Sequence, residues 1–356
     1  MPITRLTVEN FTVFDRIDIS FSNGINVFIG DNGTGKTHLL KVLFAFCECD
    51  KTPFVLSAKT TDTVKGKDKN VTESILSFIH NSFFDKLQKF FLVEDVKTLY
   101  REHQNEPSFT LSYYDSKEPF QFISNLYAQT IKQSDAFLSN PYTINSAFIP
   151  AKEMLTHARI EKDYAVRKVP FDETLINIIN KTGATELRKL KDDSQNLLDS
   201  IERIIHGKVL IDNDVYYISR GNVKHNFQVE AEGYKKFATL LRLIKTGILS
   251  NGSILFWDEP EANINPQNIP ALVDILVTLR EMNVQIFITT HDYLLAKYLE
   301  VRNTQNTGLL FHALYKNHID GVLLSESSES FTTLKNNDII KQSIALYEEE
   351  VEKVLG

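Results

Sequence analysis

The segment that most constrains the fold of this chain is a short glycine-rich run between two apolar stretches. Residues 25–29, INVFI, have the composition of a buried strand, and residues 37–46, THLLKVLFAF, have the apolar spacing of an amphipathic helix. The loop between them, GDNGTGKT, fits the pattern G-x-x-x-x-G-K-[ST] from Gly30 to Thr37. A strand that enters such a loop and leaves it as a helix predicts a phosphate-binding loop.

The residue types in this loop suit a nucleoside triphosphate. Glycines allow backbone N–H groups to wrap around phosphate oxygens, and the N-terminus of the following helix adds partial positive charge. We expect Lys36 to neutralise the β and γ phosphates and the hydroxyl of Thr37 to bind Mg²⁺. The predicted ligands are therefore ATP and Mg²⁺, and the predicted binding residues of the loop are Gly30, Asp31, Asn32, Gly33, Thr34, Gly35, Lys36 and Thr37.

A second apolar run ends in two carboxylates. Residues 254–257, ILFW, precede Asp258 and Glu259, and a run of this kind indicates a buried parallel strand. The carboxyl ends of parallel strands meet at one edge of a sheet, so both side chains should lie beside the phosphate-binding loop. We expect Asp258 to hold Mg²⁺, directly or through water, and Glu259 to polarise an attacking water, as a hydrolase requires.

A third apolar run places a histidine at the same edge. Residues 284–288, VQIFI, are followed by two threonines and His291. A histidine in this position can reach a γ-phosphate and would report whether that phosphate is present. We therefore predict Glu259 and His291 as the catalytic residues.

Taken together, these segments resemble the ABC-type ATPase heads of the RecF/SMC/Rad50 group. The resemblance rests on LTVENFTVFDRIDISFSNGINVFIGDNGTGKT, WDEPEANINP and ITTHD, and it covers about the first fifty residues and residues 207–315. It is strongest toward stand-alone bacterial AAA-like proteins of the AAA_15 and AAA_21 types, similar to overcoming-lysogenization-defect proteins without a Toprim domain. Many of these are encoded in phage-defence or abortive-infection operons. The resemblance implies an α/β P-loop NTPase head with a mixed sheet and an inserted helical or α+β lobe.

The resemblance also implies a signature segment that completes the ATP site of a second subunit. Its candidates are Glu232, Gly233 and Tyr234, which precede an amphipathic helix. In such heads this helix start binds the γ-phosphate held by the other subunit, so that ATP joins two heads head to tail. Two residues depart from the pattern: Ala231 stands at the usual signature serine, and Thr12 stands where an arginine usually follows Asn-Phe.

Four segments follow from this assignment. They are 1–50, the first half of the ATPase core; 51–206, an inserted α+β and helical lobe; 207–315, the second half of the core with the signature, Walker B (254–259) and histidine segments; and 316–356, a C-terminal strand-helix tail. Within the lobe, residues 146–153 resemble the Q-loop segment of the family, which senses Mg²⁺ and nucleotide. That segment has no glutamine, and Lys152 or Glu153 is expected to replace it. The polar stretch 59–70 is predicted to be an exposed loop.

Composition narrows the classes of function. A hydrophobic content of 42% and a net charge of −7 describe a globular protein, expected in the cytoplasm, without a general basic surface for nucleic acid. No apolar run is long enough to cross a membrane. Residues 180–183, NKTG, do not form the guanine-reading NKxD pattern, which disfavours a GTPase. Only about sixty-five residues follow His291, too few for a Toprim domain, so no nuclease activity is expected in this chain.

Three functions stay open on this basis. The first is an ATP hydrolase that forms a homodimer or higher homo-oligomer and acts as sensor or regulator of an anti-phage system. Its partner would be a separate effector, a nuclease or toxin encoded nearby. The second is a RecF-like DNA-repair ATPase that binds DNA directly, although the acidic net charge counts against it. The third is a scaffold that binds ATP with little turnover, for which Ala231 and Thr12 leave room.

Overall fold

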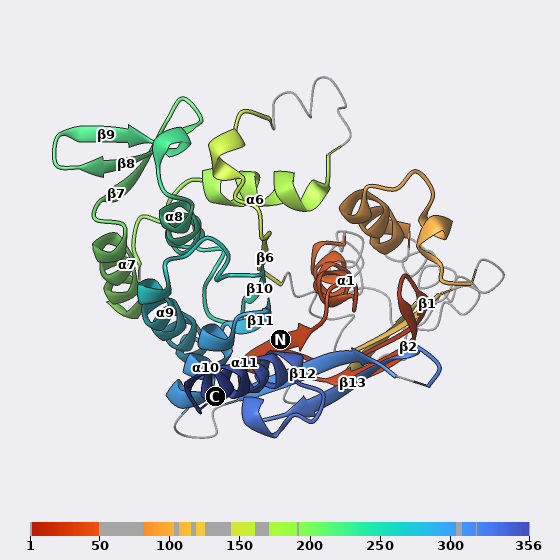
Figure 1. Cartoon of the computed structure of the whole chain (residues 1–356). Coiled ribbons are helices and arrows are strands. Elements are labelled where there is room, and N and C mark those ends of the chain that lie inside the picture. The colour runs from red at the N-terminus through yellow and green to blue at the C-terminus, as the bar shows by residue number, and fades with distance from the viewer. Residues whose placement is uncertain are drawn as a thin grey trace, which may run out of the picture.

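A computed structural model gives the fold of the chain. It describes residues 2–49, 81–102, 107–114, 119–124, 144–160, 171–190, 192–303, 308–317 and 319–355, so the predicted loop 59–70 lies outside the described residues. The described strands form a six-stranded, a four-stranded and a three-stranded sheet. Helices cover the larger sheets (Figure 1).

The six-stranded sheet carries the predicted buried strands. Its order is β13-β12-β3-β11-β10-β6, and all neighbours are parallel except β12 and β13. Its strands are β3 (Ile25–Gly30), β6 (Ser146–Ile149), β10 (Ile254–Asp258), β11 (Gln285–Thr289), β12 (Leu309–Lys316) and β13 (Leu323–Ser328). Strands β3 and β11 are buried along their whole length. The prediction of a buried parallel strand at residues 254–257 is therefore confirmed, and the apolar runs 25–29 and 284–288 also form buried parallel strands.

An antiparallel sheet packs beside this central sheet. Its order is β2-β1-β4-β5, with β1 (Ile3–Phe11), β2 (Phe14–Ser20), β4 (Ser108–Tyr114) and β5 (Pro119–Ser124). The buried amide of Gln285 joins the two sheets, because it accepts from the backbone N–H of Ile3 at 2.8 Å and donates to the carbonyl of Ile3 at 2.8 Å. One side chain of the central sheet thus satisfies both the backbone N–H and the backbone carbonyl of Ile3, at the start of β1.

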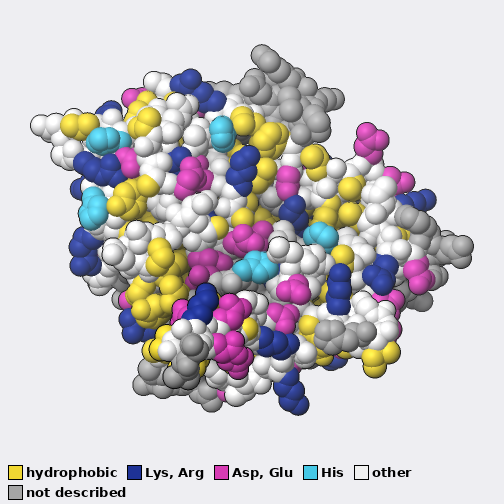
Figure 2. All heavy atoms as spheres, viewed as in Figure 1, with side chains coloured by type: hydrophobic (Ala, Val, Ile, Leu, Met, Phe, Trp, Pro, Cys, Tyr) yellow, Lys and Arg dark blue, Asp and Glu magenta, His cyan; other side chains and the backbone are white. Residues whose placement is uncertain are grey.

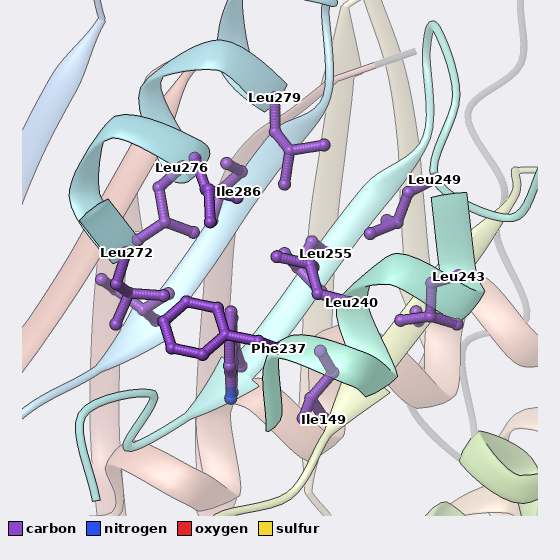
Figure 3. Packing of buried hydrophobic residues seen from close by; sticks show 14 of the residues in the cluster. Ile149, Phe237, Leu240, Leu243, Leu249, Leu255, Leu272, Leu276, Leu279 and Ile286 are labelled. Atoms are coloured by element: carbon purple, nitrogen blue, oxygen red, sulfur yellow. The ribbon is translucent and has the colours of Figure 1, made fainter. Parts of the chain in front are cut away.

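Alternating side chains of the central strands supply two separate cores. Leu255 and Trp257 of β10 face one core, whereas Phe256 faces the other and stacks on Phe287 of β11, with ring centroids 5.2 Å apart. The first core is covered by α8 (Glu232–Lys245), α9 (Ile269–Glu281) and α10 (Tyr293–Arg302). Figure 3 shows leucines of α8 and α9 converging on Leu255 and Ile286. The second core holds α1 (Lys36–Glu48), helical residues 81–91 and the antiparallel sheet.

Segments from the range 51–206 take part in both larger sheets. Strands β4 and β5 extend the antiparallel sheet, and β6 forms one edge of the central sheet. The helices of this range are α6 (Glu173–Gly183) and α7 (Asp192–Ile204). A partly buried ion pair, Lys181 Nζ to Glu48 Oε1 at 2.6 Å, fixes α6 to α1. The described part of this range is therefore integrated with the core, and its assignment as a separate lobe stays a prediction.

The remaining elements lie at the periphery. The three-stranded sheet consists of β7 (Lys208–Asp212), β8 (Val215–Arg220) and β9 (Val223–Asn226), which pair antiparallel ahead of α8. The predicted terminal helix is α11 (Asp338–Leu355). Short 3-10 turns occur at Val96–Leu99, Leu155–His157, Phe227–Val229, Pro266–Asn268 and Phe331–Thr333. None of the helices in the described part of the chain combines the length and apolarity that crossing a membrane demands.

Candidate active site

The phosphate-binding loop joins β3 to α1 and needs glycine at two positions for steric reasons. Gly30 has φ +141°, and a Cβ there would lie 2.1 Å from the carbonyl oxygen of Leu314. Gly35 has φ +83°, and a Cβ would lie 2.5 Å from the ring of Phe14. Gly33, with φ +77°, needs its glycine for conformation rather than space. The loop is thus shaped by both neighbouring sheets.

Lys36 closes this loop from inside. Lys36 is only 7% exposed, and its Nζ donates to the carbonyl oxygens of Gly30 at 2.7 Å and Asp31 at 2.9 Å. Burial lowers the pKa of Lys36 to about 8, although the charges of Glu259 and Asp258 oppose that shift. An arriving phosphate would raise this pKa again, because it brings negative charge to the ammonium group.

Thr37 and Asp258 meet although they are far apart in the chain. The Thr37 hydroxyl lies 3.0 Å from each carboxylate oxygen of Asp258. A hydroxyl beside a carboxylate is the hard oxygen donor set that Mg²⁺ prefers, so these residues fit the ion. Within the described ranges, no group of three or more His, Cys, Asp or Glu side chains could hold a metal ion. Phosphate and water oxygens would therefore have to complete the coordination of Mg²⁺.

Glu259 sits in a strained turn that two neighbours hold. Its φ of 45° lies in the left-handed region, which is unfavourable for a residue with a side chain. Its backbone N–H donates to Thr289 Oγ1 at 3.0 Å, and its carbonyl accepts from Lys236 Nζ at 2.8 Å. Thr289 Oγ1 in turn donates to Asp258 Oδ1 at 2.6 Å. One buried threonine thus fixes both acidic residues of the site.

His291 lies against the carboxylate of Glu259. Its Nε2 is 3.7 Å from Glu259 Oε1, and both side chains are partly exposed. Burial and the nearby charge of Lys36 lower the pKa of His291, so its ring is neutral at pH 7. Figure 2 shows acidic and histidine side chains gathered near the middle of the visible face.

Glu261 connects the two loops that carry these residues. Its Oε1 accepts from Thr290 Oγ1 at 2.6 Å and from the backbone N–H of His291 at 3.2 Å. Burial raises the pKa of Glu261, although both hydrogen bonds oppose that shift. The turn after β10 and the loop after β11 are therefore held together by a carboxylate that is itself shielded from water.

The candidate signature residues lie at the start of α8 and contact a different part of the chain. Helix α8 begins at Glu232, and its N-cap residue Ala231 forms no side-chain cap. A Cβ on Gly233 would lie 3.1 Å from the carbonyl oxygen of Asn263, so this glycine permits close packing on the segment after β10. Tyr234 packs partly buried against the first core. The contacts thus unite Lys36, Thr37, Asp258, Glu259 and His291, whereas Gly233 faces residues 263–264.

Thr12, one of the two departures, and Glu153 of the Q-loop-like segment each have a hydrogen-bond partner within the chain. The Glu153 carboxylate accepts from the backbone N–H groups of Leu155 and Thr156 and thereby closes a turn. Lys152 is exposed. The hydroxyl of Thr12 lies 3.1 Å from Nδ1 of His38, the residue after the phosphate-binding loop. A role for Lys152 or Glu153 in sensing nucleotide stays a prediction.

Thr289, Lys236 and Glu261 shape the site, yet sequence reasoning gave them no role. One signal was present for Lys236: it falls four residues before Leu240 on the apolar stripe of α8, and the residue is only 2% exposed. A lysine on a buried face needs acceptors nearby. Thr289 and Glu261 carry no comparable signal, because their partners belong to other strands and loops.

Comparisons with known proteins identify a family and a fold for this chain. Residues 25–297 match the sequence profile of the AAA_21 family, described as "AAA domain, putative AbiEii toxin, Type IV TA system". The DNA replication and repair protein RecF of Mannheimia succiniciproducens is 50% identical over 44 residues, 12% of each chain. RecF of Halalkalibacterium halodurans is 31% identical over 83 residues, 23% of this chain and 20% of that protein. The chain thus matches a fifth or less of these relatives' length.

A solved structure shows the same fold. The SMC head domain from Thermotoga maritima superposes with a TM-score of 0.50 and 12% sequence identity, over 92% of this chain and 100% of that chain. At that identity the likeness concerns the fold alone. The family match covers most of the chain and includes the phosphate-binding loop, Asp258, Glu259 and His291. The chain therefore belongs to the AAA_21 family of ATPases and has the ABC-type head fold of the RecF/SMC group.

Proposed function

We propose that this protein hydrolyses Mg-ATP at the carboxyl edge of its central sheet. The observation that carries this proposal is the convergence of a cationic, a hydroxyl and two carboxylate side chains from two segments far apart in the chain: Lys36 and Thr37 from one, Asp258 and Glu259 from the other. Such a set provides phosphate neutralisation, metal ligands and a base for water within one site.

Each residue has a distinct task in this proposal. Lys36 exchanges its two loop carbonyls for phosphate oxygens, while Thr37 and Asp258 hold Mg²⁺. The ion, when bound, neutralises charge that develops on the phosphate oxygens. Glu259 accepts the proton of the attacking water. The neutral ring of His291, 3.7 Å from Glu259, donates an N–H toward the γ-phosphate.

We also propose that two heads associate head to tail on ATP, with the backbone N–H groups at the start of α8, beside Gly233, directed at the partner's phosphate. Supporting this, the first turn of α8 has no side-chain cap at Ala231, so its N–H groups are suited to bind an anion. Opening and closing of such a dimer would couple hydrolysis to a bound partner. The protein would then serve, in the cytoplasm, as the sensor or regulatory subunit of an anti-phage or toxin-type system.

The family description, which names a toxin of a type IV toxin–antitoxin system, supports that role. A second candidate is a RecF-like repair ATPase, which the RecF matches favour. The two differ in the ligand: a separate effector protein in the first, DNA in the second. The net charge of −7 counts against DNA as the ligand.

Steady-state ATPase assays on the full chain test the chemistry. Lys36→Ala should abolish ATP binding, whereas Glu259→Gln should retain binding, lose turnover and accumulate an ATP-bound dimer in light scattering. Wild-type turnover in Glu259→Gln would remove Glu259 as the base. Fluorescence anisotropy with duplex DNA at 50 and 200 mM salt then separates the candidate roles. Tight, salt-dependent binding by the isolated protein would favour repair.

A further inference from the structure

Helix α11 carries an apolar stripe that the fold leaves largely uncovered. Its members recur at spacings of four and three residues, which places them on one face of the helix. They are Ile340, Ile344, Tyr347, Val351 and Val354, here called the α11 seam. Ile344, Tyr347 and Val354 are 52%, 66% and 84% exposed. A narrow seam with this period is the pattern by which one helix pairs with another.

The first turn of α11 is fixed to the body of the protein. Asn337, itself buried, accepts from the backbone N–H of Ile340 at 3.2 Å and donates to the carbonyl of Phe331 at 2.8 Å. Ile339 and Ile340 pack against the first core. The later turns therefore extend from an anchored start, and the seam is presented on a rigid element.

The charges beside the seam indicate what covers it. Lys341, at a flanking position in the first turn, is paired with Asp338 at 2.8 Å. Glu348 and Glu350 flank the later, exposed turns of the seam on its two sides, at the positions that select partners in paired helices. Residues 344–355 contain four glutamates and one lysine. Figure 2 shows acidic side chains clustered over the lower part of the visible face, where α10 and α11 lie. A second copy of α11 would place more glutamates against these, so a helix with lysines or arginines beside its own stripe fits better.

We propose that the α11 seam docks an amphipathic helix of a separate protein, one whose apolar stripe is flanked by Lys or Arg. Apolar contact along the seam supplies the affinity, and the Glu348 and Glu350 carboxylates select the basic partner. The seam lies beyond residues 25–297, the range that matches the AAA_21 family. The proposal rests on the proposed function only in that it gives the effector a docking surface.

Peptide binding to the full chain tests this proposal without requiring ATP hydrolysis. The probes are two fluorescent helical peptides about three heptads long, with Leu and Ile in the seam and either Lys or Glu at every flanking position. We expect the lysine peptide to bind at least about tenfold more tightly than the glutamate peptide. Tyr347→Glu should weaken binding of the lysine peptide about tenfold or more. Leu346→Glu, at a 56% exposed position outside the seam, should leave binding unchanged.

The charge reversal Glu348→Lys with Glu350→Lys should invert the preference between the two peptides. Equal binding of both peptides, no binding, or binding that survives Tyr347→Glu would overturn the proposal. Sedimentation of the protein alone tests whether a second copy of α11 occupies the seam instead. A concentration-dependent dimer that Tyr347→Glu abolishes would assign the seam to a second copy and also overturn it. Peptide binding should persist in Lys36→Ala, so failure of the ATPase proposal and failure of this one are distinguishable.

Discussion

Thr289→Val is the substitution that most directly probes how the site is held. Thr289 is fully buried, and its hydroxyl donates to Asp258 Oδ1 at 2.6 Å while accepting from the Glu259 N–H at 3.0 Å. Valine has nearly the same shape, so the change leaves no cavity. It removes a charge-assisted hydrogen bond and leaves a backbone donor without its acceptor.

Each lost interaction has a known scale. A hydrogen bond to a charged group contributes roughly 1.5–3 kcal/mol, and an unsatisfied buried donor costs about 1–3 kcal/mol. Burying the extra methyl of valine returns about 0.8 kcal/mol. Because Asp258 and Glu259 are only partly buried, we expect a net loss of about 2 kcal/mol in the free energy of unfolding, near the low end of these ranges.

The effect on turnover should be larger than the effect on ATP binding. Glu259 keeps a φ of 45° while its N–H and carbonyl are both held, and such strain costs of order 1–3 kcal/mol. Without Thr289 the turn can relax and displace the carboxylate. We expect kcat to fall about ten- to a hundredfold, equivalent to about 1.4–2.7 kcal/mol, with KM changed less than about threefold.

Urea unfolding and steady-state ATPase assays on the same samples check both numbers. Thr289→Ser is the matched control, because it keeps the hydroxyl and loses only the methyl group. It should retain kcat within about threefold of the wild type. Wild-type turnover in Thr289→Val, or an equal loss in both variants, would refute the reasoning that the hydroxyl positions Glu259.

Three further results are expected. Lys181→Met should destabilise the fold by about 1.5–3 kcal/mol, since it leaves the partly buried Glu48 charged without its cationic partner, while Ser146 and Asn177 still donate to it. Burial acts to raise the pKa of Glu48, but the charge of Lys181 and the hydrogen bonds from Lys181, Ser146 and Asn177 outweigh it and lower that pKa. The stability from this pair is therefore present above the ordinary pKa of a glutamate and lost as pH falls, a dependence that unfolding curves should show weakened in the variant. Burial lowers the pKa of His312 to about 3. Below pH 6.5 the unfolded chain takes up a proton on this histidine while the folded chain does not, so the free energy of unfolding falls by up to about 1.4 kcal/mol per pH unit. NMR titration of the folded protein should find this ring neutral at pH 4.5. Lys236→Met should change the free energy of unfolding little, because two effects offset each other. Removing the buried charge, whose burial lowers the pKa of Lys236 to about 8, stabilises the fold by about 3 kcal/mol, while losing the hydrogen bond to the Glu259 carbonyl destabilises it. Its kcat should still fall about tenfold, and an unchanged kcat would show that Lys236 does not hold the turn.

Much of the site follows from local patterns. Gly30 to Thr37 are recognisable because a phosphate-binding loop needs its glycines, lysine and hydroxyl at fixed spacing in one continuous segment. Asp258 and His291 are recognisable because each follows a short apolar run, and parallel strands end at a common edge. These signals depend on neighbouring residues alone, so the sequence reveals them before any strand is paired.

Other features depend on residues that are distant along the chain. The order of the strands, with β6 beside β10 and β3 between β11 and β12, arises from packing that no local pattern encodes. Nor does any local pattern reveal that Thr289 binds Asp258, that Lys236 holds Glu259, or that Gly233 packs on Asn263. Local residue patterns are thus enough to predict the chemistry of the phosphate-binding loop and of the strand ends. The buried side chains that fix the strained turn at Glu259 emerge only from the folded chain, because their hydrogen bonds exist only when separate strands and helices are brought into contact.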